Sequence, residues 1–325
     1  MDTMPAFLLA LVEITPLHYA VFIGGVLVFL ALDLGVFHRK AHAVTFREAF
    51  AWTLVFFTLA MGFAAALVPM RGRGEALEFV TGYIIELSLS MDNVFVIALI
   101  FAYFRVPPEL QHRVLFWGIL GALVMRGLMI WGGAVLVSRF HGVLYLFGGF
   151  LLFTGVKMLF VDDDGVHPEK NPVLNLTRRL YPVTREFEGD RFITRLDGRR
   201  ALTPLALVLL MVETTDLVFA VDSIPAIFAV TEKPFIIFTS NVFAILGLRS
   251  LYFVLAGAIR YFRYLKIGLA LVLAFIGLKM LVKPWLDIPT GASLLVVGAL
   301  ILLSVLLSIL ALRASPPADP PPPAA

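Results

Sequence analysis

The hydrophobic pattern of this chain consists of long apolar runs, separated by short charged turns or turns that contain Pro and Gly. A run of about 20 apolar residues is long enough to cross the hydrocarbon core of a bilayer as an α-helix. The pattern predicts about nine such spans, at residues 16–37, 46–70, 77–104, 112–137, 140–160, 203–230, 234–257, 263–283 and 290–312. The expected fold class is therefore all-α, a polytopic transmembrane helical bundle.

Two polar segments interrupt or follow the spans. The stretch from Asp162 to Arg200 carries charges of both signs, which predicts a solvated loop with room for one short helix. The end of the chain is rich in proline and is expected to be a disordered tail. We therefore divide the chain into a two-span segment at 1–76, a three-span unit at 77–161, a cytoplasmic loop at 162–202, a second three-span unit at 203–284, a last span at 285–313 and the tail at 314–325.

The composition agrees with a membrane protein. Apolar residues make up 60% of the chain and charged residues 15%, whereas soluble domains contain about half and about a quarter. Cysteine is absent, which excludes disulfides, thiolate metal sites and cysteine catalysis. The net charge is only +3, and no basic patch with interleaved aromatic residues occurs, so nucleic acid is not an expected partner.

The distribution of Lys and Arg predicts the orientation in the membrane. If the N-terminus lies outside, the cytoplasmic loops and tail carry 17 of these residues and the outer loops carry 5. Without the long loop the counts are 9 and 5. Because cytoplasmic loops carry the excess of Lys and Arg, we expect an outer N-terminus and a cytoplasmic C-terminus.

The two three-span units resemble each other in sequence. Three motifs recur in the same order at offsets of 124, 123 and 122 residues: Asp92-Asn-Val-Phe-Val-Ile with Asp216-Leu-Val-Phe-Ala-Val, Leu123-Val-Met-Arg126 with Leu246-Gly-Leu-Arg249, and Phe153-Thr-Gly-Val-Lys-Met-Leu159 with Phe275-Ile-Gly-Leu-Lys-Met-Leu281. Since each unit has an odd number of spans, the second copy enters the membrane from the opposite side. Inverted three-helix repeats are typical of transporters, whose sites lie at the repeat interface near the midplane.

Acidic residues inside the spans indicate where that site lies. Five carboxylates occur on the first helix of the two repeats: Glu86, Asp92, Glu213, Asp216 and Asp222. Inserting these five charged side chains into a bilayer would together cost roughly 12–17 kcal/mol of free energy. This is as much as the free energy of unfolding of a whole protein domain. They must be paired, protonated, hydrated or bound to a cation. Only Arg126 and Arg249 lie deep in the spans, so about three negative charges remain. A cation site is expected, and a purely structural ion-pair network is the alternative.

Helical geometry groups these side chains. At 100° per residue, Ser90 and Asn93 share a face with Glu86, and Asp92 lies about 120° away. Asp222, next to Ser223, lies about 180° from Glu213 on an unbroken helix. Pro225 is expected to break that helix and to turn Asp222 inward, because a proline frees a carbonyl of the preceding turn. A kink that serves packing alone is the alternative.

The ligand types narrow the cation. Carboxylate, amide and hydroxyl oxygens are available, whereas the six histidines fall at span ends or in loops. Oxygen-rich sites suit Mn²⁺, Mg²⁺ or Ca²⁺ better than Zn²⁺ or Cu⁺. No resident cofactor is expected, and the cation would be cargo. The predicted metal ligands are Glu86, Asp92, Asn93, Glu213, Asp216 and Asp222, supported by Ser90, Ser223, Arg126 and Arg249.

Four segments resemble a known family. They are Glu86-Leu-Ser-Leu-Ser-Met-Asp-Asn-Val-Phe, Val212-Glu-Thr-Thr-Asp-Leu-Val-Phe-Ala-Val-Asp-Ser-Ile-Pro-Ala, Asn241-Val-Phe-Ala-Ile-Leu-Gly-Leu-Arg-Ser-Leu-Tyr-Phe and Ala31-Leu-Asp-Leu-Gly-Val-Phe-His-Arg-Lys. These segments are similar to the TerC/Alx family of bacterial inner-membrane proteins. The resemblance covers nearly the whole chain, except the tail and much of the polar loop. It implies export of divalent metal, chiefly Mn²⁺, and its acidic motif residues match the predicted ligands.

The family also carries a historical tellurium-resistance label. A carboxylate cage does not account for that label, because it should repel an oxyanion. We expect export by alternating access with protons returning through the same carboxylates, and no enzymatic activity. An intramembrane aspartyl protease could use Asp92 and Asp222 but lacks its Gly-x-Gly-Asp signature. A scaffold of a resistance or secretion complex is the other alternative, and it predicts that acid-to-amide variants stay functional.

Overall fold

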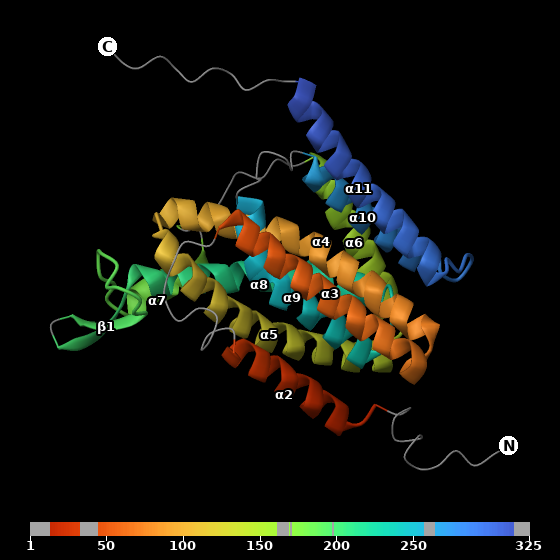
Figure 1. The fold of residues 1–325 in the computed structure, drawn as a ribbon, viewed down its shortest axis with the longest axis horizontal. Coiled ribbons are helices and arrows are strands. Elements are labelled where there is room, and N and C mark those ends of the chain that lie inside the picture. Colours follow the sequence, from red (N-terminus) through yellow and green to blue (C-terminus); the bar gives the residue numbers. More distant parts are fainter. Residues whose placement is uncertain are drawn as a thin grey trace.

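The computed structural model describes residues 14–32, 45–160, 169, 171–196, 198–256 and 264–314 (Figure 1). Nearly all of these residues are helical. The helices of the bundle are α2 (Pro16–Leu32), α3 (Phe46–Arg71), α4 (Arg73–Phe104), α5 (Pro108–Arg139), α6 (Val143–Phe160), α8 (Pro204–Phe228), α9 (Pro234–Ala256), α10 (Leu265–Val282) and α11 (Thr290–Ala314). The polytopic helical fold predicted from the sequence is confirmed.

The predicted spans correspond closely to these helices. Within the part of the chain that is described, eight helices, all of them except α2, are long and apolar enough to cross a membrane. The first predicted span, 16–37, appears as the shorter helix α2, and its residues 33–37 lie outside the described residues. Most of the opening motif from Ala31 and residues 315–325 of the predicted tail also lie outside them.

The polar stretch after α6 contains more regular structure than expected. Its predicted short helix is α7 (Pro172–Leu180), which Asn171 caps by accepting bonds from the backbone N–H groups of Val173 and Leu174. The strands β1 (Ile193–Leu196) and β2 (Arg199–Leu202) then form an antiparallel hairpin. This hairpin was not predicted, because its alternating pattern extends over only four residues in each strand.

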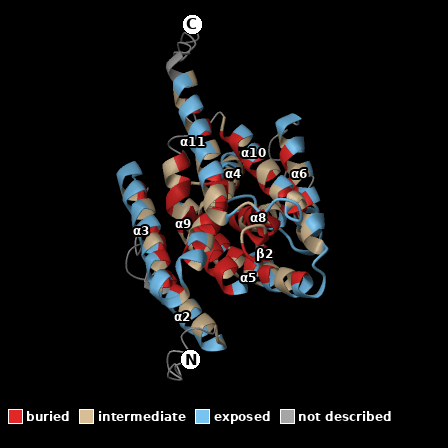
Figure 2. Ribbon diagram, turned by 90° about the vertical axis from the view of Figure 1, so that its right-hand side faces the viewer, coloured by how far each residue is buried: buried red, intermediate tan, exposed pale blue. Residues whose placement is uncertain are grey.

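The centre of the bundle consists of α4, α5, α8 and α9 (Figure 2). The apolar segment of α9 is 78% buried, against 17% for the apolar segments of α6 and α11. Helix α4 packs against α9 and α8, and α5 packs against α8 and α9. The outer helices α3, α6 and α11 carry rows of exposed large apolar side chains, as expected for surfaces that face lipid. The polar site described below lies among the central helices.

The third helices of the two predicted repeats are in backbone contact. A Cβ added at Gly277 of α10 would lie 2.6 Å from the carbonyl oxygen of Gly148 in α6, and one added at Gly155 would lie 2.6 Å from that of Ala270. Gly155 and Gly277 hold the same place in the third repeated motif. Small residues allow such close approach of helices in membranes. The inverted relation of the two repeats itself stays a prediction.

This contact generates a prediction about stability. We expect Gly277→Ala to destabilise the protein by about 1–3 kcal/mol, because the new methyl group meets backbone atoms that cannot move aside. Gly149→Ala is the matched control, since nothing lies within 4 Å of a Cβ at that position. The thermal unfolding midpoint in detergent measures both variants. Equal midpoints would show that α6 and α10 do not depend on this contact.

Candidate cation site

A cluster of charged side chains lies inside the central helices. Glu86 and Asn93 come from α4, Arg126 from α5, and Asp216 and Ser223 from α8. Each of these five residues is at most 4% exposed. Since charged groups are costly in an apolar interior, they persist there only when they are paired and hydrogen-bonded.

Arg126 connects the carboxylates of α4 and α8. Its Nη2 lies 2.9 Å from Asp216 Oδ1 and its Nε lies 3.2 Å from Asp216 Oδ2, a two-pronged contact. Its Nη1 forms an ion pair with Glu86 and donates to Ser223 Oγ at 3.4 Å. Asn93 Nδ2 donates to Asp216 Oδ1 at 2.7 Å. One guanidinium from α5 therefore holds acids from the first helices of both predicted repeats.

Several polar atoms of the central helices have no hydrogen-bond partner among the described residues. They include Glu86 Oε2 and Asn93 Oδ1 at the cluster, and both side-chain polar atoms of Asn241 on α9. Asn241 is 1% exposed, and its neighbour Ser240 approaches α4 at Gly82, one turn before Glu86. Buried polar atoms are rarely left unpaired. These oxygens could therefore hold water or a cation. Asn241 was not among the predicted ligands, although a polar residue inside an apolar span is a signal of function.

The other predicted acids lie elsewhere on the same helices. Glu213 is half-buried and faces α5, where its carboxylate fills the place of a side chain at Gly121. Asp222 is half-buried and faces α6, where it accepts a hydrogen bond from Thr154. Asp92 is half-buried on α4. The structure thus joins Glu86 and Asp216 through one arginine and aims Glu213 and Asp222 at two different helices.

The expected break at Pro225 does not divide α8. The helix continues through Pro225 to Phe228, because a proline near a helix end disturbs only the last turn. Asp222 therefore keeps the orientation of an unbroken helix and faces α6, where Lys157 is its nearby positive charge. Of the remaining supporting residues, Ser90 is buried on α4 and Arg249 is half-buried on α9. Within the described ranges, no three His, Asp or Glu side chains converge as a ready metal cage.

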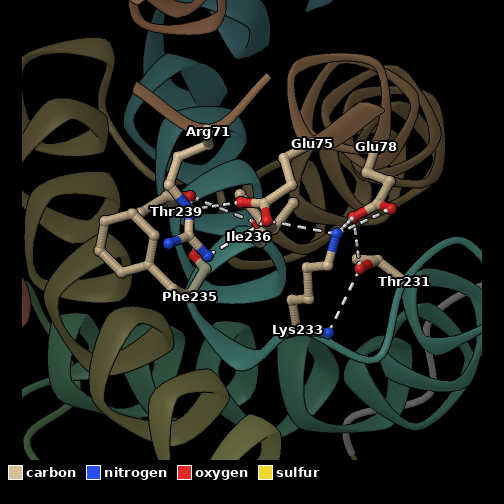
Figure 3. A network of polar contacts seen from close by, with 8 residues as sticks. All are labelled: Arg71, Glu75, Glu78, Thr231, Lys233, Phe235, Ile236 and Thr239. Carbon is tan, nitrogen blue, oxygen red and sulfur yellow. Dashed lines mark hydrogen bonds and ion pairs between the residues drawn. The ribbon is translucent and has the colours of Figure 1, made fainter. Parts of the chain in front are cut away.

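A second polar network lies at the N-terminal end of α4 (Figure 3). Lys233 Nζ lies 3.3 Å from Glu75 Oε1 and 3.1 Å from Glu78 Oε2, and Thr231 Oγ1 donates to Glu78 Oε2 at 2.7 Å. Arg71 Nε donates to Glu75 Oε2 at 2.7 Å. The network ties the α3–α4 corner to the turn between α8 and α9. Its ion pairs are partly exposed, so each is worth at most about 1 kcal/mol.

The polar loop packs against the opposite end of the central helices. Asn171 Nδ2 lies 3.1 Å from Thr214 Oγ1 and 3.3 Å from Met211 Sδ, both on α8. Leu174 of α7 is fully buried in the apolar cluster that α4, α5, α8 and α9 share. Arg113 of α5 forms an ion pair with Asp190. The loop therefore packs along the first half of α8, as far as Thr214, the residue after Glu213.

The fold and the site define a polytopic membrane protein with paired charges at its centre. Residues 71–316 match the Integral membrane protein TerC family, and the chain belongs to this family, as its motifs predicted. It is 49% identical to the "Uncharacterized membrane protein STKORF319" of Myxococcus xanthus over 94% of this chain and 96% of that protein. It is 48% identical to the "Putative membrane-bound redox modulator Alx" of Escherichia coli (strain K12) over 90% of this chain and 94% of that protein. No solved structure matches the chain.

The central ion pairs predict a large effect of removing Arg126. Arg126→Gln leaves Glu86 and Asp216 buried without a counter-charge, which should destabilise the protein by about 3–5 kcal/mol. Arg139→Gln is the matched control, because that arginine lies exposed at the end of the same helix. The measurement is the thermal unfolding midpoint in detergent with a chelator present. A midpoint equal to that of the wild type would contradict the pairing.

Proposed function

We propose that this protein transports a divalent cation, Mn²⁺ foremost, out of the cytoplasm by alternating access. The observation that carries the proposal is the meeting of Glu86 and Asp216, from the first helices of the two predicted repeats, in the buried centre of the spans. Repeat interfaces near the midplane are where transporters bind their cargo. The outward direction is the one that the resemblance to the TerC/Alx family implies.

The chemistry of the donors supports a hard or borderline divalent cation. The cluster offers two carboxylates, the amide oxygen of Asn93 and the hydroxyl of Ser223, which suit Mn²⁺, Mg²⁺ or Ca²⁺. Some relatives are named as redox modulators. This chain has no cysteine, so a redox effect would not come from its own thiols. Control of the concentration of a redox-active metal such as Mn²⁺ would produce a redox effect without any thiol in this chain.

Proton exchange is the proposed driving force. A cation binds the ionised carboxylates, and therefore cation binding competes with protonation. When the site opens outward, protons from the more acidic side would replace the metal on Glu86 and Asp216. The partly exposed network of Figure 3 and the docked polar loop lie toward opposite ends of the central helices. The ion pairs at both places are partly exposed, and such pairs separate at modest cost.

Transport in proteoliposomes tests the proposal. We expect Mn²⁺ flux, followed with an entrapped dye, to rise with an imposed pH gradient and to fall to the rate of empty liposomes in Glu86→Gln or Asp216→Asn. Glu109→Gln makes the same chemical change at an exposed position of α5 and should keep the flux. Flux without dependence on the gradient would remove proton coupling. Absence of flux for the wild type, with all variants active in cells, would favour the scaffold.

The proposed orientation, with the N-terminus outside and the C-terminus in the cytoplasm, has a direct test. Because the chain has no cysteine, single cysteines report their side of the membrane without background. Asp287→Cys lies in the exposed turn between α10 and α11, and Arg179→Cys lies exposed on α7. We expect a membrane-impermeant maleimide to label the first on intact cells and the second only after permeabilisation. The reverse pattern would invert the orientation.

A further inference from the structure

The central site contains a positive charge that the protein itself supplies. Arg126 contacts both oxygens of Asp216 and forms an ion pair with Glu86. A divalent cation held by the same two carboxylates would need the oxygens of Asp216, both of which the guanidinium now contacts. Cargo binding therefore has to displace Arg126, and a guanidinium displaced within an apolar interior needs another anion.

Glu213 is placed to be that anion. It lies three residues before Asp216 on α8, which puts both carboxylates on neighbouring positions of one face. Its carboxylate occupies the space beside α5 that the missing side chain of Gly121 leaves open. Arg126 already contacts Asp216, which lies within one turn of Glu213 on α8. Glu213 Oε2 has no hydrogen-bond partner in the part of the chain that is described.

We propose that Arg126 moves between two anionic partners, bridging Glu86 and Asp216 when the site is free of cargo and pairing with Glu213 when a divalent cation takes its place. The inference rests on the proposed function and names the step that admits the cargo. Glu213 is then a positioning residue for the arginine, and Gly121 provides the clearance for its carboxylate.

The charges explain why this exchange favours a divalent cation. When ionised, Glu86, Asp216 and Glu213 together with Arg126 carry a net charge of −2, which one divalent cation cancels. A monovalent cation would leave one negative charge uncompensated in the apolar interior, which is costly. Because Arg126 stays close to the site after it is displaced, the cation that replaces it must carry two positive charges, whichever oxygens bind that cation.

A double-mutant cycle tests the exchange. Mn²⁺ binding to the purified protein in detergent is measured by isothermal titration calorimetry at constant pH, for the wild type, Glu213→Gln, Arg126→Gln and the double variant. We expect Glu213→Gln to weaken binding about tenfold when Arg126 is present, because the displaced arginine loses its second partner. In the Arg126→Gln background the same change should have less than about a twofold effect. Glu109→Gln controls for the loss of a carboxylate from an exposed site.

Two outcomes would overturn the inference. Equal weakening by Glu213→Gln in both backgrounds would make Glu213 a direct ligand of the metal, and no weakening in the wild-type background would give it no part in binding. A wild-type protein that binds no Mn²⁺ would instead refute the proposed function. Where Arg126→Gln does not fold, a structure with Mn²⁺ bound decides. The guanidinium should lie within hydrogen-bond distance of Glu213, and its persistence on Asp216 would overturn the exchange.

Discussion

A carboxylate in the middle of an apolar bundle lacks the water that stabilises its charge, and the architecture of this protein depends on how Asp216 meets that constraint. Its two oxygens receive the guanidinium of Arg126 and the amide of Asn93. These partners come from α5 and α4, so satisfying one buried charge on α8 fixes the three helices against one another. The pairing is incomplete in charge, because Glu86 shares the same arginine.

The surroundings of the cluster combine rigid and weak contacts. On one side α6 and α10 meet backbone to backbone through glycines, so no side chain separates the two helices there. At the ends of the central helices the contacts are partly exposed: the network around Lys233 at one end, and the loop held by Asn171 and Arg113 at the other. The charged pairs are thus buried in the centre and partly solvated at the ends, and the buried side chain of Leu174 holds the loop in addition.

The sequence by itself determined the class of protein and the inventory of its charges. Apolar runs of membrane length are local properties, so the spans were predicted within a few residues, and the repeated motifs located the helices that carry the acids. The cost of charge in an apolar run is also local, which singled out the five carboxylates Glu86, Asp92, Glu213, Asp216 and Asp222 before any contact was known. The family followed from the same motifs.

Only the tertiary structure decided which acid meets which partner. The helices are apolar on every side, so the sequence pattern does not show which side faces a neighbour. Asp216 and Asp222 lie on the same helix, yet one faces Arg126 of α5 and the other Thr154 of α6. The clearance at Gly121 that admits Glu213 exists only because α8 passes close to α5 at that point. Packing across the whole bundle sets how each helix is rotated about its axis and how far it lies from its neighbours. The local sequence pattern predicts neither the rotation nor the distance.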